Sequence, residues 1–277
     1  MSMTEPQGYV LGQTARAARR LELQDAHLAD LSERLLDELA LRPGDRVVEL
    51  GCGPGSFSRR ILRRLGEGGV LVGVDRTEGL LEQARAALAG AGPARFEPVL
   101  ADIAGLGAWL DGADVVVGRT VLHHLQMVEF VLGRLRAAVR PGTRVGFLEP
   151  DFRSPLARLA YLETTGRAEL APLRAWAVTI NQLYLASRLS PGTGASLART
   201  LALAGYRRVR ADWAEQHSDG SALENMLMFY DEVRDRLQAL GILSAAEIDE
   251  QQRRLRALPA GPLLPAAWGI HLVAAET

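Results

Sequence analysis

Lysine is missing from this 277-residue chain, and cysteine occurs only once. The 32 basic residues are all arginine and oppose 33 acidic ones, so a net charge of -1 gives no general attraction to nucleic acid or to an anionic membrane. The single cysteine, Cys52, excludes an internal disulfide and a CxxC metal or redox site. Aromatic residues make up 5% and do not alternate with a basic stripe, so we expect no nucleic-acid partner.

Long apolar runs are missing as well. No segment has the roughly 20 apolar residues that a membrane helix needs. Residues 1–9 lack the charged and then apolar pattern of a secretory signal. We therefore expect a cytoplasmic protein with neither a membrane span nor a metal site. The 48% hydrophobic content is enough for a sizeable core, in one large domain or one domain with an inserted subdomain.

A glycine-rich turn follows the first apolar run of the chain. Residues 47–50 read as a short buried strand, and Gly51, Gly53 and Gly55 come directly after it. Glycine lets backbone approach another group where a side chain would block it. A helix is expected over 56–65, so the turn joins a strand to a helix and is placed to hold a ligand.

Strands alternate with helices after this turn. Further strands are expected over 70–75, 96–100, 113–118 and 144–148, with helices over 79–89 and 127–139 between them. This alternation predicts an α/β fold: a Rossmann-like, doubly wound sheet of seven strands, mostly parallel, with the last strand antiparallel. In such sheets ligands bind beyond the carboxyl ends of the strands.

Polar residues gather where these strands end. They include two acids, Asp75 and Asp102, then Arg119 with His123 and His124, and finally Glu149 with Asp151. Because the carboxyl ends of parallel strands meet at one edge of the sheet, we expect these side chains to line one site.

The remaining segments predict a domain organisation around this core. Residues 1–40 form an N-terminal arm and one long helix, and 41–150 form the core. Helical insertions over 151–190 and 214–264 are expected to cap the site and bind the substrate, while 191–213 and 265–277 complete the sheet.

Two ligands suit the glycine turn on its own. A dinucleotide would need the GxGxxG pattern, but Ser56 stands where the third glycine is required. Pro54 removes a backbone donor that a phosphate would use, and Glu49 would lie beside the pyrophosphate. A cationic amino-acid group suits Glu49 better.

The segment 48–55, Val-Glu-Leu-Gly-Cys-Gly-Pro-Gly, resembles the first motif of class I S-adenosylmethionine-dependent methyltransferases. Asp75 resembles their ribose-binding acid, and residues 101–103 resemble their adenine-contacting motif. Residues 118–125 are similar to their fourth motif. The Tyr9-x-Leu-Gly arm, followed by Arg20 and Gln24, is similar to a subgroup of natural-product methyltransferases. The resemblance covers residues 9 to about 151 and is weak beyond.

The resemblance implies S-adenosylmethionine as the cofactor, with S-adenosylhomocysteine as the product. Glu49 would orient the ammonium group, Asp75 would accept from the ribose hydroxyls and Arg119 would meet the methionine carboxylate. The full set of implied cofactor-binding residues is Tyr9, Arg20, Gln24, Glu49, Gly51, Cys52, Gly53, Gly55, Asp75, Arg76, Ala101, Asp102, Ile103 and Arg119.

The catalytic candidates are His123, His124 and Glu149, with Asp151 as a further strand-end acid. A histidine near the sulfonium is suited to deprotonate a hydroxyl or amine, because its pKa lies near neutral pH. A base is optional, however, since alignment of the acceptor with the methyl group supplies most of the acceleration.

We therefore expect methyl transfer, by in-line displacement, to an oxygen or nitrogen atom of a small, partly apolar metabolite, with carbon as a further option. The alternatives are a fold repurposed for another reaction such as a cyclisation, or a non-catalytic protein that binds a small molecule. The acceptor stays open, because the segments that would define it match the family least. A homodimer is one option for the oligomeric state, through the long N-terminal helix or the cap.

Overall fold

The structure, a computed structural model, describes residues 15–216, 220–258 and 267–277. The chain divides into two compact units. One, here called the sheet unit, comprises Leu28–Asp151, Gly192–Ala214 and Ile270–Thr277. The other, the helical unit, comprises Met1–His27, Phe152–Pro191 and Glu215–Gly269. Their boundaries fall close to the insertions that the sequence predicts, but a capping role for the helical unit stays a prediction.

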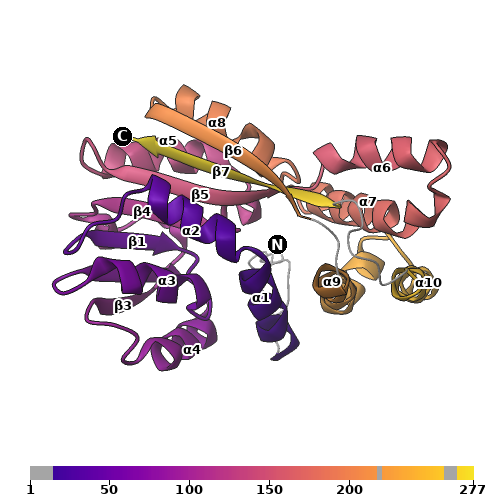
Figure 1. Ribbon diagram of the computed structural model, residues 1–277, viewed down its shortest axis with the longest axis horizontal. Helices are drawn as coiled ribbons and strands as arrows, with labels where there is room; N and C mark the ends of the chain where they lie inside the picture. The colour runs from indigo at the N-terminus through magenta and orange to yellow at the C-terminus, as the bar shows by residue number, and fades with distance from the viewer. Residues whose placement is uncertain (1–14, 217–219, 259–266) are drawn as a thin grey trace, which may run out of the picture. The chain divides into compact units, whose positions relative to one another are not determined.

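A seven-stranded sheet organises the first unit, in the order β3-β2-β1-β4-β5-β7-β6 (Figure 1). The strands from β1 to β5 pair in parallel, as predicted. β7 runs antiparallel to β5: Thr277, just after β7, donates its N–H to the carbonyl of Thr143, just before β5 (3.1 Å). The strands are β1 Arg46–Leu50, β2 Val70–Asp75, β3 Arg95–Leu100, β4 Val115–Arg119, β5 Arg144–Asp151, β6 Arg207–Gln216 and β7 Trp268–Glu276.

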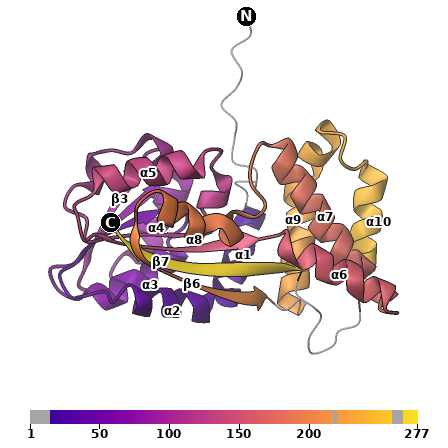
Figure 2. The same ribbon diagram turned by 90° about the horizontal axis from the view of Figure 1, so that it is seen from above.

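Helices cover both faces of this sheet, with α2 and α3 on one face and α5 and α8 on the other (Figure 2). The central strands β1, β4 and β5 are therefore buried on both sides, which explains their continuous apolar runs, whereas the outer strand β3 is only partly buried. The helices of this unit are α2 Ala29–Glu38, α3 Ser56–Leu65, α4 Glu78–Leu88, α5 Val128–Ala138 and α8 Thr193–Leu203. Three short 3-10 helices, Ile103–Gly105 (η1), Ala108–Leu110 (η2) and Leu122–His124 (η3), are the elements that the sequence did not predict.

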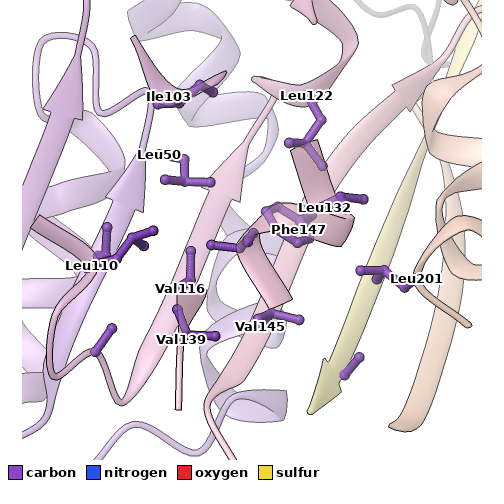
Figure 3. Close-up of a cluster of buried hydrophobic side chains, with 14 of the residues drawn as sticks. Leu50, Ile103, Leu110, Val116, Leu122, Leu132, Val139, Val145, Phe147 and Leu201 are labelled. Atoms are coloured by element: carbon purple, nitrogen blue, oxygen red, sulfur yellow. The ribbon is translucent and has the colours of Figure 1, made fainter. Parts of the chain in front are cut away.

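A hydrophobic core of the sheet unit lies between the sheet and the helices α5 and α8 (Figure 3). Leu50, Val116 and Phe147 come from three neighbouring strands, and Leu132 of α5 and Leu201 of α8 pack over them. All five side chains are buried. This core fixes the positions of the strand ends, and therefore of the polar groups that follow them.

The helical unit is built around α9, Gly220–Ala239, which packs against α1 (Ala15–His27) and α10 (Ala245–Arg256). Its other helices are α6, Ser154–Thr164, and α7, Ala171–Ala186, with the short η4, Ala168–Leu170, between them. Ring contacts join Phe152, Trp176 and Phe229, with centroid distances of 6.1 and 5.7 Å. The two helices predicted over 219–257, with a break at Gly241, are confirmed.

The single long helix predicted over residues 14–40 is wrong. Two helices occupy this stretch, and they belong to different units. Leu28, between them, leaves helical geometry at φ −97° and ψ 10° while it remains fully buried. The apolar spacing runs on across both helices, so periodicity alone could not reveal the break.

No helix in the described part of the chain is long and apolar enough to cross a membrane.

Candidate cofactor-binding site

The glycine turn after β1 adopts backbone conformations that favour glycine. Gly51, Gly53 and Gly55 have φ angles of +67°, +53° and +90°. A Cβ on Gly51 would lie only 2.5 Å from Cγ2 of Val121, whereas a Cβ on Gly53 would meet nothing within 4 Å. Gly51 is thus required by a close contact with the segment after β4. Gly53, in contrast, leaves open space at the turn where a ligand would approach.

Glu49 lies on β1 just before this turn and is 2% exposed. Ser58, in the first turn of α3, donates a hydrogen bond from Oγ to Oε2 of Glu49 at 2.5 Å. The helix that follows the glycine turn therefore fixes the direction of the carboxylate. Sequence reasoning missed Ser58; its position three residues after Gly55 on the helix was the only available signal.

Asp75 at the end of β2 is oriented by two backbone groups. Its Oδ2 accepts from the N–H of Gly53 and its Oδ1 accepts from the N–H of Thr77, both at 2.9 Å. The carboxylate is half-buried, and each oxygen keeps acceptor capacity for a further donor. Asp75 is thus tied directly to the glycine turn, and its ribose-binding role stays a prediction.

The next strand end carries Asp102 and Ile103. Asp102 is exposed and caps η1, since its Oδ1 accepts from the N–H of Ala104 at 2.8 Å. Ile103 is buried in the core cluster, and the partly buried Ala101 packs against the same cluster. The capping bond uses one oxygen of Asp102, so its predicted contact with an adenine amino group stays a prediction.

Arg119 ends β4, next to β1 in the sheet. Its guanidinium carbon lies 4.9 Å from the ring centroid of Phe57, and Nη1 donates to Oγ of Ser32 at 3.1 Å. Phe57 lies in the first turn of α3, which follows the glycine turn. The arginine is therefore held beside that turn, where a ligand carboxylate could be bound.

The 3-10 helix η3 follows β4 and carries both candidate histidines. His123 is 4% exposed, whereas His124 is partly exposed. Their ring centroids lie 4.0 Å apart at an interplanar angle of 43°. Thr120, just before the turn, adopts φ +51°, which is strained for a β-branched residue.

Glu149 on β5 is fully buried and its carboxylate is bound to this turn. Oε1 accepts from the N–H groups of Val121 and Leu122 at 2.9 and 2.8 Å. Oε2 accepts from the N–H of His123 at 3.2 Å and lies 2.7 Å from its Nδ1. Burial raises the pKa of Glu149 to about 7, and the three backbone donors oppose that rise. A role for Glu149 as a base stays a prediction.

Asp151 lies two residues further along β5 and is also fully buried. Its Oδ2 lies 3.8 Å from Nε2 of His271 on β7. The end of β5 therefore carries two acids, each beside a histidine from a neighbouring segment.

Other predicted residues lie elsewhere. Tyr9 is outside the described residues. Arg20 and Gln24 are on α1 in the helical unit, where Arg20 forms an ion pair with Glu232 (2.9 Å). Their predicted cofactor contacts stay predictions.

Cys52 and Arg76 differ in exposure. The Cys52 side chain is buried against β2, with Sγ 3.0 Å from where a Cβ of Gly73 would lie. Burial, together with Glu49 and Asp75, raises the pKa of the Cys52 thiol, so it packs as a small apolar group rather than as a nucleophile. Arg76 is exposed after Asp75.

Metal binding has no support among the residues described, which contain no group of three or more His, Cys, Asp or Glu side chains suited to hold an ion. A hollow of about 360 Å³ lies at the opposite edge of the sheet, near the start of β5. Four of its charges form two ion pairs, Arg144 with Asp45 at 2.7 Å and Arg140 with Asp114. It is therefore not a candidate for the same chemistry.

Comparison with known proteins shows that this chain is similar to methyltransferases. A family model described as a methyltransferase domain matches residues 48–145, from β1 to the start of β5. An uncharacterized methyltransferase of Mycobacterium bovis is 31% identical over 139 residues, which cover 49% of this chain and 68% of that protein. The chain belongs to the class I S-adenosylmethionine-dependent methyltransferases.

One further relative in sequence and one solved structure are also similar to this methyltransferase. The trans-aconitate 2-methyltransferase of Variovorax paradoxus is 35% identical over 129 residues, covering 46% of this chain and 48% of that enzyme. The first curated relatives are matched over only about a third to a half of their own length. The cyclopropane synthase MmaA2 of Mycobacterium tuberculosis superposes with a TM-score of 0.59 at 14% identity, over 90% of this chain and 84% of that one. At that identity the likeness shows the fold alone.

Proposed function

We propose that this protein transfers the methyl group of S-adenosylmethionine to an oxygen or nitrogen atom of a small, partly apolar metabolite, with carbon as a further option. One observation carries the proposal. The carboxylate of Asp75 is bound to the glycine turn at Gly53, so a ribose-binding acid and a close-approach backbone form one unit. A chain of this family with that arrangement has the main parts of a cofactor site.

The residues of the sheet unit fit the cofactor along its length. Asp75 would accept from the two ribose hydroxyls, and an ionised acceptor makes such bonds strong. Buried Glu49, held by Ser58, would face the ammonium group. Open space beside Gly53 allows the ligand to approach the backbone. Asp102 would meet the adenine amino group and Arg119 the carboxylate.

The cofactor supplies a sulfonium methyl group, which is electrophilic because the sulfur leaves as a neutral thioether. The protein then has to align an acceptor atom with that methyl group and exclude water. His124, the more exposed of the two histidines, is the better placed to take a proton from the acceptor. His123 and Glu149 are bound to each other instead.

The acceptor is proposed by class only. The relatives named for trans-aconitate suggest a carboxylate-bearing acceptor as one candidate beside the apolar metabolites expected from the sequence. We assign acceptor recognition to the helical unit, whose ring cluster includes Phe152, Trp176 and Phe229. A cytoplasmic location and a homodimer remain predictions.

Calorimetry tests the cofactor part of this proposal. The full chain is titrated separately with S-adenosylmethionine, S-adenosylhomocysteine and NAD. We expect micromolar binding of the first two and none of NAD. Binding of NAD without binding of either sulfur compound would refute the proposal.

A transfer assay then tests the reaction. Release of S-adenosylhomocysteine is followed with a panel of hydroxyl, amine and carboxylate acceptors that includes trans-aconitate. We expect release that depends on one acceptor class. Tight binding of the cofactor with no release from any acceptor would instead support a repurposed fold or a non-catalytic binding protein.

A further inference from the structure

The carboxylate of Glu149 has three backbone N–H donors and one ring nitrogen of His123 arranged around its two oxygens. Val121 and Leu122 donate their N–H groups to Oε1, while the N–H and the ring Nδ1 of His123 face Oε2. The side chain is fully buried. A carboxylate that is fully buried and surrounded in this way offers no exposed oxygen to a substrate.

The turn bound by Glu149 is also the turn that presses on the glycine motif. Cγ2 of Val121 occupies the place that a Cβ on Gly51 would need, at 2.5 Å. Thr120 enters the turn at φ +51° and donates its N–H to the carbonyl of Leu148 at 2.7 Å. Such a conformation is strained and persists only where the surroundings enforce it. The bonds to Glu149 supply that enforcement.

The backbone of Glu149 is also in close contact with helix α8. A Cβ on Gly194, in the first turn of α8, would lie 2.3 Å from the carbonyl oxygen of Glu149. Helix α8 thus packs directly on the end of β5. A chain of contacts therefore runs from α8 through β5 and η3 to the glycine turn, entirely within the sheet unit.

We propose that Glu149 is a positioning residue, which holds the turn of residues 120–124 against Gly51 and so shapes the cofactor site, rather than acting as the base. This inference rests on the proposed function, because it explains how Glu149 affects the binding of the cofactor. Its effect passes through Val121 to the glycine turn. The histidines are carried by the same turn, so their orientation depends on Glu149 as well.

Two substitutions of different severity test the inference. Glu149→Gln keeps the shape and two acceptor bonds but turns an NH2 group toward the N–H of His123. Glu149→Leu removes every acceptor and leaves three buried N–H groups unpaired. We expect the dissociation constant for S-adenosylhomocysteine to rise about 3- to 10-fold in the first variant and at least 30-fold in the second, measured by calorimetry.

A direct base would give the opposite pattern. Both substitutions would then lower kcat equally, and the affinity for S-adenosylhomocysteine would stay unchanged. That result, with a wild type that binds the product, would overturn the positioning role and leave the proposed function intact. A wild type that binds neither cofactor form would instead refute the proposed function.

Two controls keep the test decisive. His123→Asn retains the three backbone donors to Glu149, so we expect its product affinity to stay within about threefold of wild type. Val121→Ala keeps Glu149 but removes the methyl groups that press on Gly51, and we expect a 3- to 10-fold loss of affinity. If Glu149→Leu does not fold, an unchanged affinity in Val121→Ala would still contradict the inference.

Discussion

Oδ2 of Asp75 accepts a hydrogen bond from the backbone N–H of Gly53 at 2.9 Å, across 22 residues of sequence. This bond joins the end of β2 to the glycine turn after β1. The two strands are neighbours in the parallel sheet, with Leu50 paired to Val74. The acid and the turn therefore hold each other in place before any ligand arrives.

Replacing Asp75 by alanine should weaken cofactor binding strongly. The change removes an ionised acceptor for two ribose hydroxyls and also releases Gly53. Hydrogen bonds to charged groups contribute about 1.5–3 kcal/mol each, so a loss of about 3 kcal/mol, or about 100-fold in affinity, is expected. Calorimetry with S-adenosylhomocysteine measures it. The matched control is Asp111→Ala, an exposed aspartate before β4, for which affinity should not change. Unchanged affinity in the Asp75 variant would discard its ribose role.

The two glycines at 51 and 53 should respond differently to alanine. Both have positive φ, but a methyl group at Gly51 would collide with Val121, while one at Gly53 would meet open space. Gly51→Ala should therefore lose about 2–4 kcal/mol of stability, from the backbone conformation and the overpacking together. Gly53→Ala should lose about 1–2 kcal/mol, while its cofactor affinity falls at least tenfold.

Urea denaturation and calorimetry on both glycine variants separate these effects. Gly51→Ala combined with Val121→Ala should regain part of the lost stability, since the second change removes the collision. Equal stability losses in Gly51→Ala and Gly53→Ala would contradict the packing argument.

The strand ends were predictable because buried parallel strands leave an apolar signature. The strand predicted over 70–75 is confirmed residue for residue, and the helix over 56–65 likewise. A ribose-binding role could be proposed for Asp75 from its place at the end of such a strand. The contacts of Glu149 could not be predicted, since its partners are Val121, Leu122 and His123, and only the pairing of β4 with β5 brings them together.

The break at Leu28 shows a second limit. The apolar spacing continues through α1 and α2, so the sequence predicts one helix. The break depends on which surface each half packs against, and α1 packs on α9 whereas α2 packs on β5. Tertiary contacts of this kind override the local apolar periodicity, and the periodicity does not predict them.

Stability should depend on pH through Glu149. Burial raises its pKa to about 7, above the ordinary value that it regains on unfolding. Between about pH 4.5 and pH 7 the folded state therefore holds a proton on Glu149 that the unfolded state has released. The stabilising effect of this proton is complete below about pH 4.5. Protonated Glu149 can donate to Nδ1 of His123, so their contact survives the titration. As pH rises to about 7, this contribution is lost, by up to about 3 kcal/mol.

Urea denaturation of wild type and Glu149→Gln at pH 5 and pH 7.5 checks this effect. The variant cannot titrate at this position, so the stability of the wild type relative to it should fall between the two pH values. A difference that stays constant, or that grows with pH, would show that the carboxylate is already ionised at pH 5 in the folded protein.

The pair Arg20–Glu232 should be important for the stability of the helical unit. Nε of Arg20 donates to both carboxylate oxygens of Glu232, at 2.9 and 3.1 Å, and the side chains are only 5% and 2% exposed. Replacing the arginine takes a counter-ion away from a buried carboxylate, so Arg20→Met should cost about 3–5 kcal/mol. Arg20→Met with Glu232→Met should cost clearly less, since an apolar pair carries no uncompensated charge.

The same pair also decides between two roles for Arg20. Its Nη2 is buried with no hydrogen-bond partner among the described residues, so a contact with the cofactor is still open to it. If Arg20 serves stability alone, the double variant should bind S-adenosylhomocysteine as wild type does; a tenfold loss of affinity in that stable variant would establish the predicted cofactor contact. Arg253→Met in α10 breaks an exposed ion pair of the same unit and should change neither quantity, because solvent screens such pairs.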